Sequence, residues 1–69
     1  MKYNIISWDI TASPYPELTC DCWENTKDEA LNILQNQSEN SRGIIIDFST
    51  NQIIAEYKFK KLEILITKT

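Results

Sequence analysis

The fold of this chain is decided by residues 25–34, Asn-Thr-Lys-Asp-Glu-Ala-Leu-Asn-Ile-Leu. Thr26 is followed three positions later by Glu29, which is the spacing of a capping box. In a capping box, each of these side chains can satisfy a backbone amide that the first helical turn leaves without a partner. Asp28 and Glu29 also stand where the helix dipole favours negative charge. This stretch therefore predicts a helix that begins near Thr26.

The predicted helix has one narrow apolar side. Its members are Ala30, Leu31 and Leu34, with Ile33 beside them. Residues 35–42 are polar and Gly43 follows them, so we expect the helix to end between Gln37 and Asn40. A stripe of this width indicates a helix that packs on one surface only.

Two segments before the helix alternate in the manner of strands. Residues 2–10 place Ile6, Trp8 and Ile10 on one face, while Tyr3 and Ile5 begin the other. Residues 17–24 place Leu18, Cys20 and Cys22 on one face, with Thr19, Asp21 and Trp23 opposite. The two prolines within residues 11–16 exclude a helix or a central strand between these segments. We therefore expect two strands joined by a loop.

The segment after the helix, residues 43–59, predicts a hairpin whose turn is Ser49-Thr50-Asn51-Gln52. If Phe48 faces Ile53, six residues share one face, namely Ile44, Ile46, Phe48, Ile53, Ala55 and Tyr57. Ile45 and Ile54 then lie on the opposite face. Past Phe59 the alternation changes phase at Lys60-Lys61. Leu62, Ile64 and Ile66 continue it either as a fifth strand or after a bulge.

These elements predict an α+β protein in which a single helix packs on a mostly antiparallel sheet of four or five strands. The order is ββαββ, with an extra C-terminal strand as an open alternative. A chain of 69 residues is expected to form one small domain, residues 1–69. No apolar run approaches the roughly 20 residues of a membrane helix, and the N-terminus does not have the pattern of a signal peptide. We therefore expect a cytoplasmic protein without a membrane partner.

The composition argues against catalysis. Histidine is absent and Gly43 is the single glycine, so the chain has neither an imidazole base nor a glycine-rich phosphate loop. Cys20 and Cys22 point to the same face of a strand, an arrangement that does not favour a disulfide between them. Zinc takes about four ligands, more than these two cysteines supply. We predict no enzyme activity, no cofactor and no metal. Both thiols are expected to be reduced, with at least one buried against the helix.

The leading candidate site surrounds Tyr15, which has a proline on either side. A ring restricted in this way can contact a partner at low entropic cost, or it can fold back over the sheet edge. Residues 1–39 have seven acidic and two basic side chains, a net charge of −5. This charge can repel nucleic acid or imitate it toward a basic protein partner, and it can also simply solvate the surface. The predicted partner-binding residues are Tyr15, Asp21, Trp23, Glu24 and Asp28.

A second hypothesis concerns residues 40–69, whose net charge is +2. A basic pocket at a subunit interface would bind a small ligand such as a nucleotide, and its residues would be Arg42, Lys58, Lys60 and Lys61. Both sheet faces are predicted to be apolar, and one short helix can cover only one of them. We therefore expect a homo-oligomer that buries the second face, which would contain Ile45, Ile54, Trp23 and Leu65, or that pairs an exposed strand edge.

Three segments resemble the N-terminal half of HicB-type antitoxins, namely Met1-Lys2-Tyr3, Pro16-Glu17-Leu18-Thr19-Cys20 and residues 25–31. In that family a glycine precedes the cysteine, and Thr19 replaces it in this chain. The resemblance implies an antitoxin-like binding role and assigns no functional residue. The short, acidic profile is also similar in type to the small inhibitors that phages use against host defences. Our leading hypothesis is a non-catalytic binding module that occludes a partner protein, and ligand sequestration by an oligomer is the alternative.

Overall fold

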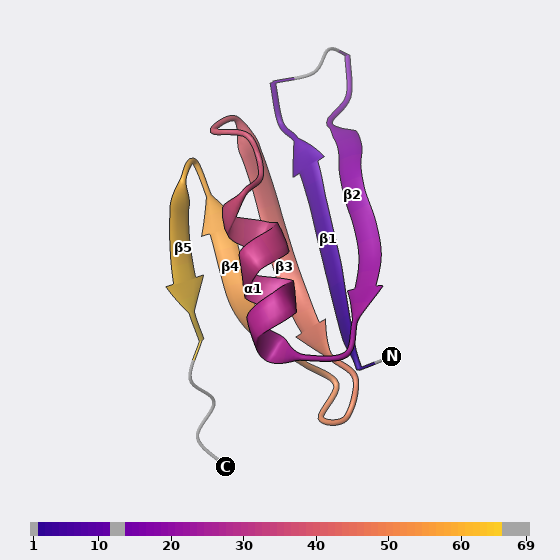
Figure 1. The fold of residues 1–69 in the computed structure, drawn as a ribbon. Coiled ribbons are helices and arrows are strands. Elements are labelled where there is room, and N and C mark those ends of the chain that lie inside the picture. The colour runs from indigo at the N-terminus through magenta and orange to yellow at the C-terminus, as the bar shows by residue number, and fades with distance from the viewer. Residues whose placement is uncertain (1, 12–13, 66–69) are drawn as a thin grey trace.

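The computed structural model describes residues 2–11 and 14–65, which form one helix and five strands (Figure 1). The elements are β1 (Tyr3–Asp9), β2 (Glu17–Glu24), α1 (Lys27–Gln35), β3 (Ser41–Asp47), β4 (Gln52–Lys58) and β5 (Lys61–Ile64). The predicted α+β class is confirmed, and of the two alternatives past Phe59 the fifth strand is the one formed. Within the described ranges, no helix is long and apolar enough to span a bilayer.

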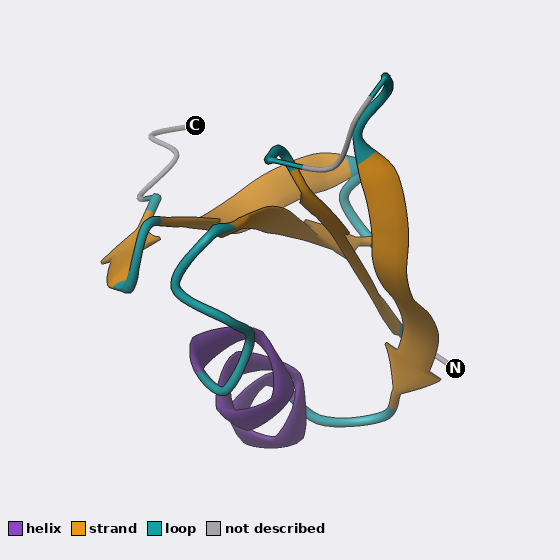
Figure 2. Ribbon diagram, turned by 90° about the horizontal axis from the view of Figure 1, so that it is seen from above, coloured by secondary structure: helices purple, strands orange, loops and turns teal. Residues whose placement is uncertain are grey.

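All five strands form one antiparallel sheet in the order β2-β1-β3-β4-β5. The chain leaves the edge strand β2, crosses the sheet as α1 and returns as β3 on the far side of β1. The sheet curves around the helix, which lies against its concave side (Figure 2). In the part of the chain that the structure describes, no helix covers the convex side.

The helix begins where the capping box predicts. Thr26 is the N-cap residue, and its hydroxyl oxygen accepts a hydrogen bond of 3.2 Å from the Glu29 amide and donates one of 2.8 Å to the Glu29 carboxylate. The helix ends at Gln35, before the predicted interval. The amides of Asn36 and Gln37 bond to carbonyls three residues back, and this tightening of the last turn ends the α-helix.

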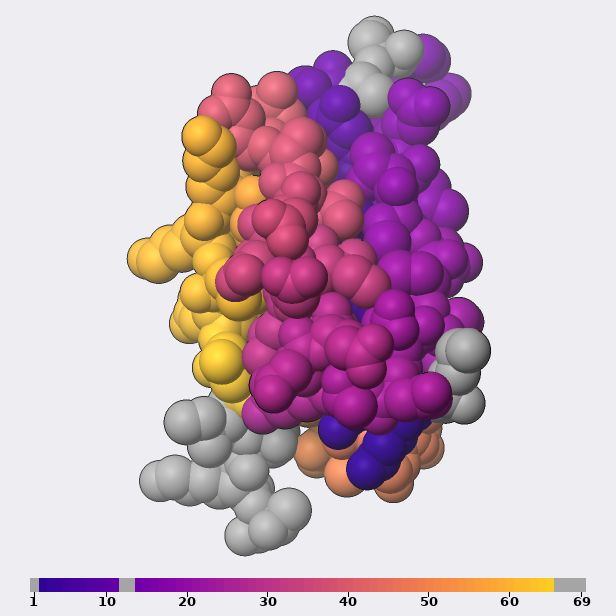
Figure 3. Space-filling view, viewed as in Figure 1, coloured from indigo at the N-terminus to yellow at the C-terminus, as the bar shows by residue number. Residues whose placement is uncertain are grey.

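The core lies between α1 and the concave side of the sheet. Its buried apolar residues are Ile5, Ala30, Leu34, Ile45, Ala55 and Tyr57. Seen from the helix side, α1 and the loop that follows it cover the middle of the sheet (Figure 3). The burial of these side chains away from water makes the main favourable contribution to the free energy that holds α1 on the sheet.

Gly43 allows the helix to approach the sheet closely. A Cβ atom at this position would lie 2.5 Å from Leu34 Cδ1, 2.9 Å from Ser7 Cβ and 3.0 Å from the Ile6 carbonyl oxygen. Atoms in a well-packed interior do not approach so closely, so any side chain there would push α1 away from β3. The single glycine of the chain is thus required by packing.

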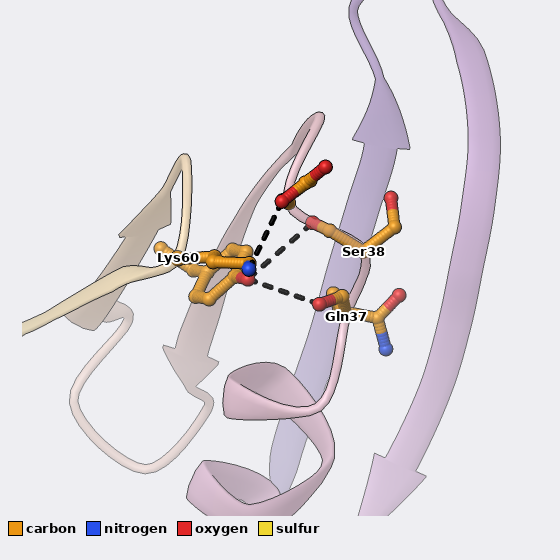
Figure 4. Close-up of polar contacts among 5 residues, drawn as sticks. Gln37, Ser38 and Lys60 are labelled. Carbon is orange, nitrogen blue, oxygen red and sulfur yellow. Dashed lines mark hydrogen bonds and ion pairs between the residues drawn. The ribbon is translucent and has the colours of Figure 1, made fainter.

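Hydrogen bonds from two buried hydroxyls fasten the loop after α1 to the sheet. The Tyr57 hydroxyl donates to the Gln37 carbonyl at 2.9 Å, with the Ser38 carbonyl at 3.3 Å (Figure 4). The buried Ser7 hydroxyl donates to the Gln37 side-chain oxygen at 3.0 Å. Gln37 therefore connects the C-terminal end of α1 to β1 and β4, and both buried hydroxyls have partners.

The register of the β3–β4 hairpin differs from the prediction. The turn comprises residues 48–51, and Ile46 faces Ile53, but Ala55 faces Ile45 instead of Ile46. The register shift leaves Ile54 as an extra residue in β4, a β-bulge. Ile45 therefore belongs to the core and Ile54 packs against it, so the prediction that these two residues form an uncovered patch is wrong.

The same shift changes the predicted set of six residues that share a face. Gly43, rather than Ile44, faces Tyr57, so Ala55 and Tyr57 lie on the helix side. The other four, Ile44, Ile46, Phe48 and Ile53, lie on the convex side or at its end. A bulge moves every residue beyond it to the opposite face, and simple alternation does not reveal it.

A second irregularity corrects the faces of β2. Ser7 pairs with Cys20 and Trp8 pairs with Leu18, so Thr19 is the extra residue. Leu18 therefore shares the convex side with Trp8, while Cys20 and Cys22 lie on the helix side. The prediction that Leu18 shares a face with both cysteines is wrong.

The phase change near Lys60 is a tight turn. Phe59 and Lys60 have φ values of 49° and 70°, the left-handed values that a two-residue hairpin turn between twisted strands requires. The turn places Leu62 opposite Tyr57 and Ile64 opposite Ala55. Ile66, which was expected to continue this strand, lies outside the described residues.

Candidate interaction face

The convex side of the sheet, which we call the open face, presents the side chains that alternate away from α1. The exposed and half-buried ones are Ile6, Trp8, Leu18, Asp21, Trp23, Arg42, Ile44, Ile46, Ile53, Glu56, Lys58, Lys61 and Glu63. Phe48, in the β3–β4 turn, joins them through its contact with Trp23. Eight of these fourteen residues are apolar, so the open face differs from an ordinary solvated surface.

One end of the open face is an aromatic corner formed by Trp23, Phe48, Ile46 and Ile53. The rings of Trp23 and Phe48 meet edge to face, with centroids 4.6 Å apart. Trp23 is 38% exposed, Phe48 49% and Ile53 44%. These large apolar side chains therefore remain available to a second molecule.

Asn4 fixes the base of the aromatic corner. It lies between Trp23 and Ile46 in the sheet register and is only 5% exposed. Its side-chain amide donates to the Asp21 carboxylate at 3.1 Å and to the Cys22 carbonyl at 3.0 Å. Asp21 is thereby held beside the aromatic corner, and the surface has a defined shape before any partner arrives.

The middle of the open face contains two parallel rows of residues that run across the strands. The acidic row consists of Asp21, Ile6, Ile44, Glu56 and Glu63, and the basic row consists of Leu18, Trp8, Arg42, Lys58 and Lys61. In both rows the β1 residue is apolar and the β4 and β5 residues are charged, while Asp21 on β2 and Arg42 on β3 add one charge to each row. Charges of opposite sign therefore occupy neighbouring rows.

Both edges of the sheet oppose pairing with another strand. The outer edge of β2 has a bulge at Thr19 and three acidic residues, Glu17, Asp21 and Glu24. The outer strand β5 is only four residues long and includes Lys61 and Glu63. Bulges, short length and charge are the features that protect edge strands from association. The open face is thus the better candidate for contact with another protein.

The predicted site around Tyr15 is not one cluster. Tyr15 is 77% exposed, so its ring does not fold back over the sheet, and its loop rises from the convex side at one end of β2 (Figure 2). Asp21 and Trp23 lie on the open face, but Glu24 lies on the helix side and Asp28 in the first turn of α1. Since β2 spans eight residues, roughly 23 Å separates its two ends. Tyr15 and Asp28 are therefore far apart.

The alternative basic set is only partly assembled. Arg42, Lys58 and Lys61 are neighbours in the basic row, whereas Lys60 lies in the turn and pairs with Glu39 at 2.9 Å (Figure 4). The three neighbours lie on a sheet surface rather than around a hollow. No pocket is found in the segments 2–11 and 14–65.

The two thiols lie together on the helix side of β2. Their sulfur atoms are 3.2 Å apart, both cysteines are free, and both are half-buried against the core. The reduced state of the thiols stays a prediction, and the expectation that at least one of them is buried is wrong, because both are only partly buried. Burial raises the pKa of the Cys22 thiol to about 11, and its hydrogen bond with Cys20 adds to the shift. Among the residues that the structure describes, no group of three or more potential metal ligands occurs.

Comparison with protein-family models, curated proteins and solved structures finds no match to this chain. The sequence identified Trp23 and Asp21 but missed Trp8, Phe48 and Ile46 as surface residues. Their signal was the run of isoleucines on both faces of one hairpin, which a helix on one side of the sheet cannot cover. The bulge at Ile54 concealed which of those isoleucines remain outside.

Proposed function

We propose that this chain is a non-catalytic binding module that occludes a partner protein, and that the open face is its contact surface. The observation that supports this proposal is the aromatic corner, where Trp23 and Phe48 are half-exposed over the buried, hydrogen-bonded Asn4. Aromatic side chains held in a fixed geometry are typical of residues that dominate binding energy. The Tyr15 loop rises on the same side and can extend the contact.

The partner that fits this surface has a protruding apolar segment bordered by charges of both signs. The apolar segment would cover the aromatic corner and Ile6, Trp8 and Ile44, and the charges would meet the acidic and basic rows. Apolar contact would supply affinity, while the charged rows would fix the register and exclude mismatched partners. We place this action in the cytoplasm of a bacterial host, where the chain would serve as a small inhibitor of anti-defence or antitoxin type.

Site-specific photo-crosslinking in cells that naturally contain this chain tests the proposal. A photo-reactive phenylalanine analogue replaces Phe48 in one variant and Asn32, on the exposed surface of α1, in a matched control. We expect position 48 to give an adduct with one protein other than this chain, and position 32 to give none. Adducts with other proteins from position 32 alone, or adducts of position 48 with this chain alone, would contradict the proposal.

A further inference from the structure

We infer that, when no other partner is present, the open face is covered by a second copy of this chain, packed face to face about a two-fold axis that runs across the strands. This inference rests on the proposed function, because it concerns the same surface and adds a competitor for it. The chain without another partner is then a dimer, and a partner must displace the second copy to reach the aromatic corner.

The charge pattern of the open face is complementary to itself. A two-fold axis between the acidic and basic rows places the acidic row of one copy over the basic row of the other. Glu56 then meets Lys58 of the second copy, and Lys58 meets Glu56, so each ion pair forms twice. The same rotation brings Ile6 over Trp8 and Ile44 over Arg42, which places apolar and aliphatic surface at the centre.

The isolated sheet, in contrast, places like charges beside each other. Glu56 lies directly opposite Glu63 on the neighbouring strand, and Lys58 lies directly opposite Lys61. Like charges at directly opposite positions destabilise an antiparallel pair of strands. A sequence selected for the monomer alone would gain by exchanging Glu63 with Lys61, which places opposite charges across each pair. The actual arrangement favours contact between rows of two copies.

The shape of the molecule agrees with this contact. Because the sheet is convex on its open side, two copies approach most closely along the middle strands β1, β3 and β4 (Figure 2). Glu56 and Lys58 lie on β4, one of these strands, so their charged pair is close to the contact. The molecule measures 38 × 22 × 18 Å, so a contact between the open faces uses its broadest side.

Exchange of charges between copies tests the inference. One variant combines Glu56→Lys with Glu63→Lys, so that the acidic row becomes mainly basic. The other combines Lys58→Glu with Lys61→Glu, so that the basic row becomes mainly acidic. Sedimentation across micromolar concentrations should show a dimer for the wild type. Each variant alone should associate about 100-fold or more weakly, because like charges then face each other across the interface.

An equimolar mixture of the two variants should recover a dimer, because each interface then joins a basic face to an acidic one. A chain with all four substitutions, whose rows are exchanged, should dimerise as the wild type does. The control, Lys27→Glu with Gln35→Glu on exposed helix positions, adds negative charge elsewhere and should leave the dimer intact. Circular dichroism checks that every variant is folded, and recovery in the mixture excludes loss of folding as the cause.

A monomeric wild type, dimeric single-row variants, or a mixture that remains monomeric would each overturn the inference. These results are separable from failure of the proposed function. A monomer that still cross-links to another protein from position 48 keeps the binding function and removes the dimer. A dimer that cross-links from position 48 to its own second copy alone keeps the dimer and removes the partner.

Discussion

The two faces of the sheet use the same residue type for different purposes. Ile45 lies on the helix side and is fully buried, whereas its neighbours Ile44 and Ile46 lie on the open face and are only half-buried. Three consecutive isoleucines therefore serve two surfaces because strand side chains alternate. Apolar character alone does not mark the core, and the position of the helix decides which face becomes interior.

The helix side contains the buried core, whereas the apolar side chains of the open face stay partly exposed. Six buried apolar residues form the whole described core of this short chain, and domains of this size have little stability in reserve. The apolar residues of the open face add little to the monomer because water still reaches them. Substitutions on the two faces should therefore separate folding from binding.

The largest effect is expected from truncation of the buried isoleucine. Ile45→Ala should lower the free energy of unfolding by about 2–5 kcal/mol, because it leaves a cavity between α1 and the sheet. Ile44→Ala, one position away on the open face, should cost about 1 kcal/mol or less in the monomer. Urea titration at low protein concentration measures both. If Ile45→Ala leaves too little folded protein, Ile45→Val gives the same comparison with a loss of about 0.5–1.5 kcal/mol.

Equal losses for the two substitutions would show that the faces do not differ in folding, and the comparison would fail. At high protein concentration Ile44→Ala should instead weaken self-association, an effect that Ile45→Val should not produce. Self-association therefore distinguishes a surface residue from a core residue whose truncation costs little stability.

Gly43→Ala should have the next largest effect, with a loss of about 1–3 kcal/mol, because the added methyl group collides with Leu34 and the backbone at Ile6. Combining it with Leu34→Ala makes room for the methyl group. The double variant should therefore be more stable than the sum of the two single losses predicts. If the losses of the two single variants simply add in the double variant, the contact between α1 and β3 is looser than it is in the structure.

Sequence patterns predicted the elements well because their signals are local. The cap at Thr26 and Glu29 marked the start of α1, and alternation identified residues 17–24 as a strand with the observed bounds. It was harder to predict which side chains face the helix. Both faces of the sheet are apolar, so alternation shows only that the side chains form two sets and does not show which set is covered. One extra residue at Thr19 moved Leu18 to the opposite face, and another at Ile54 moved Ala55 and Tyr57.

The candidate site was predicted only in part for the same reason. Trp23 and Asp21 lie on the open face, but Glu24 alternates to the helix side although it is adjacent to Trp23. Asp28 belongs to the first turn of α1, where the helix dipole already explains it. Proximity in sequence grouped residues that the sheet separates, and the pairing of distant strands grouped Trp23 with Phe48.

A smaller effect is expected at the thiol pair on the helix side. The Cys22 thiol has its pKa raised from 9.0 to about 11, first by burial and then by the hydrogen bond with Cys20. The folded state therefore holds a proton that the unfolded chain has lost above pH 9. Stability should fall as the pH rises from about 9 to 11, because the unfolded state binds fewer protons in that interval.

Urea titrations of the wild type and of Cys22→Ala at several pH values between 8 and 11 measure this contribution. The variant loses stability at every pH through its cavity, but the part of the decline that belongs to Cys22 should disappear. If the free energies of unfolding of the wild type and of Cys22→Ala decline in parallel as the pH rises, Cys22 ionises at its ordinary pKa in the folded protein.

The smallest effect is expected at the turn between β4 and β5, which lies outside both faces. Lys60 pairs with Glu39 at 2.9 Å, but both side chains are more than 60% exposed, so water and salt screen the attraction. Lys60→Ala should therefore leave the urea midpoint almost unchanged, at low salt and at high salt alike. Lys60→Gly loses the same ion pair, yet it should raise the midpoint, because Lys60 has a φ of 70° that glycine adopts without strain. A lower midpoint for both variants would show that the ion pair outweighs the backbone conformation, and that this exposed turn is fastened to the loop after α1 by charge.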